Sequence, residues 1–200
     1  MKRLAGQCVA AWLLLPVSNL WAHTAIEGID ALYNGILHPL IVPAHLLGLL
    51  ALGLLTGQQG ELQIQRVLPI FLVPLFVALL YVALGGVLIV EQLLLLWAIL
   101  CGSLVALKLS LPRWILWACL VGEGLLIGLD SVPMGLEGKD RFALLFGIFL
   151  GAGLFLMYLA MIVQRLVHPW QQIGVRVLGS WIIASSLLVL TLSIAQSSSG

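Results

Sequence analysis

Long apolar stretches separated by short polar segments fill most of the chain. Apolar and polar positions do not alternate with a period of two, as they do in the strands of a membrane β-barrel, so these stretches predict helices. A helix needs about 20 apolar residues to cross the hydrocarbon core of a bilayer, with a range of about 17–25. Six stretches approach or reach this length: Ile36–Leu55, Val67–Val90, Leu93–Leu109, Trp114–Leu129, Phe142–Val163 and Val177–Ala195. We therefore expect an all-α, polytopic membrane bundle of six transmembrane helices.

The amino-terminal segment has the pattern of a signal peptide. Two basic residues precede the apolar stretch Leu4–Leu15, which is too short to span a bilayer, and Ala22 supplies a small residue for cleavage. Cleavage after Ala22 would leave residues 1–22 as the signal peptide and residues 23–200 as one transmembrane domain. An uncleaved anchor helix is the alternative.

The basic residues predict the orientation of the bundle, because loops rich in Lys and Arg are retained in the cytoplasm. Lys139 and Arg141 fall in one loop. Five basic residues fall in loops on the opposite side of the predicted bundle: Arg66, Lys108, Arg113, Arg165 and Arg176. The side with five basic residues is therefore expected to be cytoplasmic, which places both mature termini in the periplasm of a bacterial inner membrane.

Composition excludes several classes of protein. Of the 200 residues, 62% are hydrophobic and 8% are charged, whereas about a quarter of a typical soluble chain is charged, so a soluble domain is excluded. A net charge of +1 offers no basic patch for nucleic acid. Cys8, Cys101 and Cys119 occur singly, without the spacing of a zinc site, and are interpreted as core residues. Motifs of serine hydrolases, phosphate-binding loops and HExxH metalloproteases are absent, so we expect no enzyme.

Four ionisable residues within or at the ends of the predicted spans are candidates for a site. An ionisable group at the centre of a bilayer costs at least about 2.5–3.5 kcal/mol, which makes such a residue a functional hypothesis. His38 and His45 are seven residues apart in the first span, and Glu123 and Asp130 are seven apart around the fourth. Seven residues are about two helical turns, so each pair shares a helix face. Two prolines between the histidines should bend the first span.

Depth along the two helices predicts how these residues meet. At about 1.5 Å per residue, His45 lies roughly 13 Å below the outer end of the first span, and Glu123 lies roughly 10 Å below the outer end of the fourth. We therefore expect His38 opposite Asp130 and His45 opposite Glu123, in a polar track that descends from the periplasmic face. In the alternative interpretation, His45 bonds a neighbouring carbonyl and a protonated Glu123 only holds helices together.

The mature amino terminus is a further candidate for metal binding. After cleavage His23 would be the first residue, and its free amino group and imidazole together can chelate a copper or nickel ion. The alternative is an incidental histidine at a free terminus.

The segment from His38 to Leu49 resembles a motif of the HupE/UreJ family of hydrogenase and urease accessory membrane proteins. The family pattern HPxxGxDHxLAM stands here as HPLIVPAHLLGL, with both histidines and the proline matched. A signal peptide ending in an Ala-His pair and six spans also fit that family. The resemblance implies transport or permeation of a transition metal, chiefly nickel or cobalt, with the divalent ion as cargo and no permanently bound cofactor.

The chain departs from the two family motifs at ligand positions. Ala44 replaces the aspartate that precedes the second histidine. Glu123 and Ile127 replace the two histidines of a second motif, HGxxHG, whereas the acid and the proline that follow it are kept as Asp130 and Pro133. Nitrogen and oxygen ligands suit nickel, cobalt and zinc alike. The candidate set for a divalent ion is His38, His45, Glu123 and Asp130.

Three functions remain open at this point. The first is a metal permease of the HupE/UreJ type. The second is a non-transporting accessory or interaction subunit that keeps the family fold and has lost part of the metal site. The third is a proton-coupled carrier of another small solute, with Glu123 as the proton-bearing group. The expected partners are the lipid bilayer and a divalent metal ion, and a homo-oligomer or a membrane partner subunit is left open.

Overall fold

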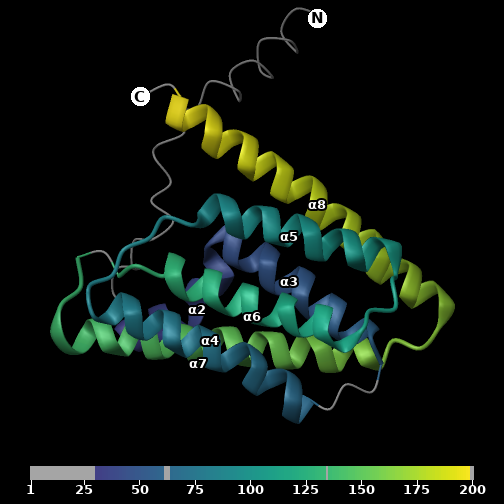
Figure 1. Ribbon diagram of the computed structural model, residues 1–200, viewed down its shortest axis with the longest axis horizontal. Coiled ribbons are helices and arrows are strands. Elements are labelled where there is room, and N and C mark those ends of the chain that lie inside the picture. Colours follow the sequence, from purple (N-terminus) through teal and green to yellow (C-terminus); the bar gives the residue numbers. More distant parts are fainter. Residues whose placement is uncertain (1–29, 61–63, 134, 199–200) are drawn as a thin grey trace, which may run out of the picture.

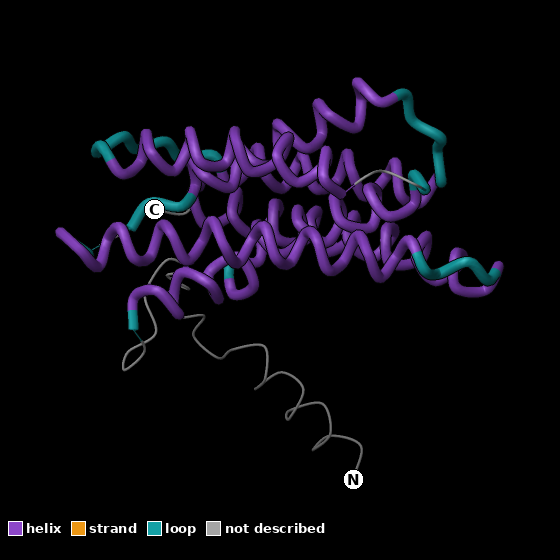
Figure 2. Tube along the Cα trace, turned by 90° about the horizontal axis from the view of Figure 1, so that it is seen from below, coloured by secondary structure: helices purple, strands orange, loops and turns teal. Residues whose placement is uncertain are grey.

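The computed structural model describes residues 30–60, 64–133 and 135–198, so the expected signal peptide and His23 lie outside the described residues. All regular secondary structure in those ranges is helical, which confirms the expected all-α fold (Figure 1, Figure 2). The helices are α2 (Ala31–Ile41), α3 (Pro43–Gln58), α4 (Ile64–Ala83), α5 (Glu91–Leu107), α6 (Arg113–Asp130), α7 (Gly138–Gln164) and α8 (Pro169–Ser198).

The first predicted span is a bent pair of helices rather than one straight helix. α2 and α3 are bent by 69° at Val42, the residue between them. Pro43 has no backbone N–H with which to continue α2, and it is well tolerated as the first residue of α3. The bend expected from the two prolines is therefore confirmed.

The two largest differences from the predicted spans are at the end of α4 and the beginning of α8. α4 ends at Ala83 rather than at Val90, because Gly85 adopts a φ of 98°, in the left-handed region that closes helices. α8 begins at Pro169 rather than near Val177, since its polar first turns continue the helix beyond the apolar stretch. The apolar pattern thus located these helices but misplaced their ends.

Three helices are long and apolar enough to cross a membrane, and the bent pair of α2 and α3 makes a fourth if it counts as one span. α5, with 17 residues, is shorter, and α6 carries Arg113, Glu123 and Asp130. Large apolar side chains project outward, among them Val73 (62% exposed) and Trp181 (68%), as expected for a surface in contact with lipid. The fold is therefore that of a membrane helical bundle, and six crossings stay a prediction.

α3 is the central helix of the bundle. Eleven of its 16 residues are buried, and it packs against α5, α6, α7 and α8. α4 pairs with α6, and α8 lies along α5 at the edge of the bundle (Figure 1). Side chains on α3 are thus withdrawn from the bilayer, which is where a polar group needs to be.

Glycines bring α2 against α7. A Cβ added at Gly35 would lie 2.9 Å from the Cα of Gly147, and Cβ atoms added at Gly147 and Gly151 would lie 2.3 Å from carbonyl oxygens of α2. The two backbones therefore touch without intervening side chains, as small residues permit in membrane bundles. The GxxxG spacing of Gly147 and Gly151 therefore serves the packing of α7 against α2, the helix that carries His38.

Helices α3 to α8 alternate in direction, so alternate loops lie at the same end of the bundle (Figure 1). One end carries the five basic residues predicted to be cytoplasmic, and hydrogen bonds tie its helices together. Arg176 Nε donates to the carbonyl of Ala106 at 3.0 Å, and Gln59 Nε2 donates to that of Leu109 at 3.0 Å. Lys139 and Arg141 lie at the other end, called here the His45 end because His45 and Asp130 also lie there.

Reporter fusions test which end faces the cytoplasm. Alkaline phosphatase is expected to be active when fused after Glu137 and inactive when fused after Gln58 or Gln172, since five basic residues outnumber two. Activity in the opposite pattern would reverse the orientation and turn the candidate site toward the cytoplasm.

Candidate functional site

An imidazole–carboxylate pair lies at the His45 end, between α3 and α6. His45 Nε2 is 3.0 Å from Asp130 Oδ2, and the two side chains are 0% and 5% exposed. His45 lies in the first turn of α3 and Asp130 is the last residue of α6. Since the two helices are antiparallel, these two ends meet, and the carboxylate lies near the positive end of the α3 dipole.

The pair fixes the orientation of the His45 ring. When Asp130 is ionised its carboxylate can only accept a hydrogen bond, so Nε2 then donates and Nδ1 is left for another partner. Nδ1 is buried and has no hydrogen-bond partner among the described residues. A carboxylate that holds one nitrogen of a histidine and presents the other is the usual support of a metal-ligating histidine.

His38 lies beside His45. It is in the last turn of α2, before the bend, and the centroids of the two rings are 5.2 Å apart with their planes at 65°. The two histidines were predicted to share a face, and the bent chain does bring their rings together. Two imidazoles and one carboxylate are thus contiguous at this end of the bundle.

Glu123 lies two turns before Asp130 on α6, deeper in the bundle. It is 0% exposed, and neither Oε1 nor Oε2 has a hydrogen-bond partner in the described parts of the chain. Its carboxyl group rests against Gly48, because a Cβ added to that glycine would lie 1.9 Å from Oε1. Glycine at this position makes the space that the carboxyl group occupies.

The predicted pairing of His45 with Glu123 is wrong. His45 contacts Asp130, whereas Glu123 faces Gly48, about one turn further along α3. The prediction counted depth along one straight helix from Ile36, but the 69° bend restarts the count at Pro43. His45 is therefore at the end of the bundle, level with Asp130.

The metal set predicted from the sequence is only partly assembled. Among the described residues, no group of three or more His, Cys, Asp or Glu side chains is placed to hold one metal ion together. His38, His45 and Asp130 form a chain of contacts, Glu123 stands apart below them, and His23 lies outside the described residues. Each of these residues as a metal ligand therefore stays a proposal.

The sequence did not reveal two contacts next to Glu123. Gly48 looked like one of many glycines, although its position three residues after His45 places it on the same side of α3. The thiols of Cys101 and Cys119 are both buried, as expected of core residues, and they lie close to each other. Cys119 is four residues before Glu123 on α6, a spacing that gives neighbours on a helix face.

A comparison with protein families matches residues 11–189 of the chain to a family model described as HupE / UreJ protein. The matched range extends from the amino-terminal apolar stretch into α8, so it includes the whole candidate site. No curated protein and no solved structure matches the chain.

Proposed function

Because the chain belongs to the HupE/UreJ family of accessory and permease-like membrane proteins, we propose that it carries a divalent transition metal ion, of the nickel or cobalt type, across the bacterial inner membrane. The observation that carries this proposal is the buried His45–Asp130 pair beside His38. Buried ionisable groups in a membrane bundle are costly and mark ion pathways.

The histidines would receive the ion first. Asp130 orients His45 and leaves Nδ1 to bind, and the His38 ring supplies a second nitrogen nearby. Nitrogen ligands of this kind suit nickel and cobalt. Asp130 then acts chiefly by holding His45 and by adding negative charge beside the cation.

Glu123 would receive the ion next. Its carboxyl oxygens are buried against α3, about two turns deeper than Asp130. Conduction needs binding that is favourable enough for entry and weak enough for release, which sites in series provide. The histidines at the His45 end and Glu123 deeper in the bundle would form such a series.

A non-transporting accessory subunit is the second candidate. It is favoured by Ala44, which stands where the family motif has an acid, because the site then lacks one charged ligand. The family is one of accessory and transport proteins, so an enzyme is not proposed.

Metal accumulation tests the proposal. Cells that lack their other nickel and cobalt importers are expected to accumulate radioactive nickel or cobalt when they express this protein, and not when they carry the empty vector. The measurement is cell-associated metal at equal protein levels. Equal accumulation in both strains would leave the accessory role as the function.

A further inference from the structure

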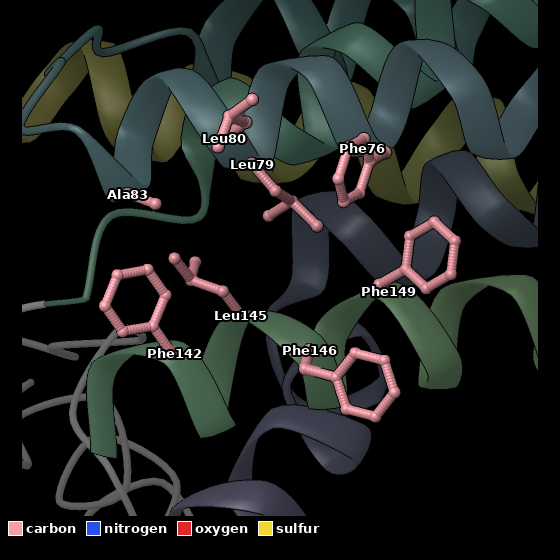
Figure 3. A pocket seen from close by; sticks show the side chains of 8 residues that line it. All are labelled: Phe76, Leu79, Leu80, Ala83, Phe142, Leu145, Phe146 and Phe149. Carbon is pink, nitrogen blue, oxygen red and sulfur yellow. The ribbon is translucent and has the colours of Figure 1, made fainter. Parts of the chain in front are cut away.

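An apolar groove opens between α4 and α7 near the His45 end (Figure 3). It has a volume of about 360 Å³, within the range of roughly 300–1,000 Å³ typical of small-molecule sites. Its wall is entirely apolar and is formed by Phe76, Leu79, Leu80, Ala83, Phe142, Leu145, Phe146 and Phe149. We call it the Phe groove.

The Phe groove extends along α4 and α7. One end is lined by Phe76 and Phe149, whose rings pack edge to face with centroids 6.1 Å apart. Ala83 and Phe142 line the other end (Figure 3). Seven residues of each helix separate the two ends, which is about 10 Å along the helix axis. A groove of this length with apolar walls offers an acyl chain an apolar surface along its axis.

Cationic side chains flank the open end. Arg141 Nη2 donates to the carbonyl of Val82, next to Ala83, while Arg141 Nε is buried and has no hydrogen-bond partner among the described residues. At about 100° per residue, Lys139 and Arg141 fall on either side of the stripe of α7 that lines the groove, and Asp140 falls on the opposite face. The open end therefore carries the positive charge of two side chains.

The open end lies at the membrane interface. The segment that follows α4 exposes Leu84 (81%) and Ile89 (91%), and residues 84–90 contain no charged side chain. In a membrane bundle, the composition of this segment favours a position among lipid, at the level where headgroups begin. Phosphate groups of lipids thus lie within reach of the two cations.

We propose that the Phe groove binds one acyl chain of an anionic phospholipid, whose phosphate is held by Arg141 and Lys139. The acyl chain fills the apolar groove, and the phosphate pairs with the positive charges of Arg141 and Lys139. Basic pockets between membrane helices bind anionic headgroups in this way. The site is independent of metal transport, since it involves none of the residues proposed to carry the ion.

Native mass spectrometry of the full chain in detergent tests the site. The protein is titrated separately with dioleoyl phosphatidylglycerol, with dioleoyl phosphatidylcholine and with glycerol phosphate. One phosphatidylglycerol molecule is expected to bind about tenfold more tightly than phosphatidylcholine. The headgroup of phosphatidylglycerol carries a net negative charge that attracts Arg141 and Lys139, whereas the headgroup of phosphatidylcholine has no net charge. Glycerol phosphate, which has no acyl chain, is expected neither to bind nor to compete.

Variants separate the two halves of the site. Ala83→Phe, which fills the groove, is expected to weaken binding of phosphatidylglycerol about tenfold, and Arg141→Gln is expected to remove the preference over phosphatidylcholine. Val177→Phe, at an exposed position on α8, and Arg165→Gln, at the other end of α7, are the matched controls and should bind as the parent does.

Unchanged binding in both Ala83→Phe and Arg141→Gln would overturn the proposal. A change of oligomeric state with Ala83→Phe, without loss of lipid, would assign the groove to a second copy of the chain instead. If Ala83→Phe does not fold, the loss of preference in Arg141→Gln decides the question alone.

Discussion

His45→Gln and Asp130→Asn are each expected to reduce accumulation of nickel or cobalt about 10–100-fold, the usual cost of losing a metal-ligating histidine or the carboxylate that orients it. Both replacements keep a hydrogen-bonding side chain in the buried pair, where His45 Nε2 and Asp130 Oδ2 are 3.0 Å apart. They avoid leaving a buried polar partner without a hydrogen bond, which costs about 1–3 kcal/mol or more. The measurement is uptake of radioactive metal per inserted protein.

His168→Gln is the matched control for these variants. His168 is exposed and precedes α8 at the far end of the bundle, so the same exchange there should leave accumulation unchanged. The permease proposal fails if His45→Gln and Asp130→Asn accumulate metal as the parent does. The proposal also fails if His168→Gln reduces metal accumulation as much as the other two variants do.

Gly48→Ala is expected to destabilise the protein by about 1–3 kcal/mol, because the new methyl group would overlap the carboxyl group of Glu123. The carboxyl group has no exposed surface toward which it can move, since Glu123 is 0% exposed. In a chain of this length each kcal/mol corresponds to about 2–4 °C in Tm. Thermal unfolding in detergent should therefore show a lower Tm, and metal accumulation should fall with the displaced carboxyl group.

A double-mutant cycle separates this overlap from a general effect of alanine. In a Glu123→Ala background the space is free, so Gly48→Ala should cost little, with a coupling of about 0.5–3 kcal/mol between the two positions. Gly174→Ala is the control, because a Cβ there meets nothing within 4 Å and alanine favours helix. Equal shifts of Tm in both backgrounds would show that Gly48 does not serve to make room for Glu123.

The contact between Gly48 and Glu123 joins two departures from the family motifs. The first motif has alanine at the position of Gly48, and the second has histidine at the position of Glu123. These positions lie 75 residues apart in the chain and touch in the bundle. Glycine in place of alanine removes a methyl group from α3, and glutamate in place of histidine puts a carboxyl group on α6. The first change makes the space that the second one fills.

The sequence predicted the helices because the bilayer leaves few alternatives. A backbone surrounded by hydrocarbon must satisfy its own hydrogen bonds, so a long apolar stretch indicates a helix without knowledge of its neighbours. The prolines also located the bend near Val42, since the lost backbone donor acts locally. The ends of α4 and α8 were misplaced because hydropathy does not report the left-handed glycine or the polar turns that decide them.

The candidate site was harder to predict because its geometry is not local. The seven-residue spacing placed His38 and His45 on one face but two turns apart, whereas the bend brings their rings within 5.2 Å. The partner of His45 also depended on the angle of the bend, which two prolines do not fix. The contact of Cys101 with Cys119 likewise depends on how α5 and α6 pack. Spacing within one helix was informative, whereas contacts between helices needed the assembled bundle.

The close approach of α2 to α7 also determines when the histidine pair can form. Gly35 and Gly147 touch although 112 residues separate them in the chain, so α2 lacks its main packing surface until α7 has entered the membrane. Synthesis proceeds from the amino terminus, and pairing of distant segments is slow because long loops must close first. Until then the polar side chains of α2 are without their final neighbours on α7. We therefore expect the contact of His38 with His45 to be among the last features of the protein to be completed during biogenesis.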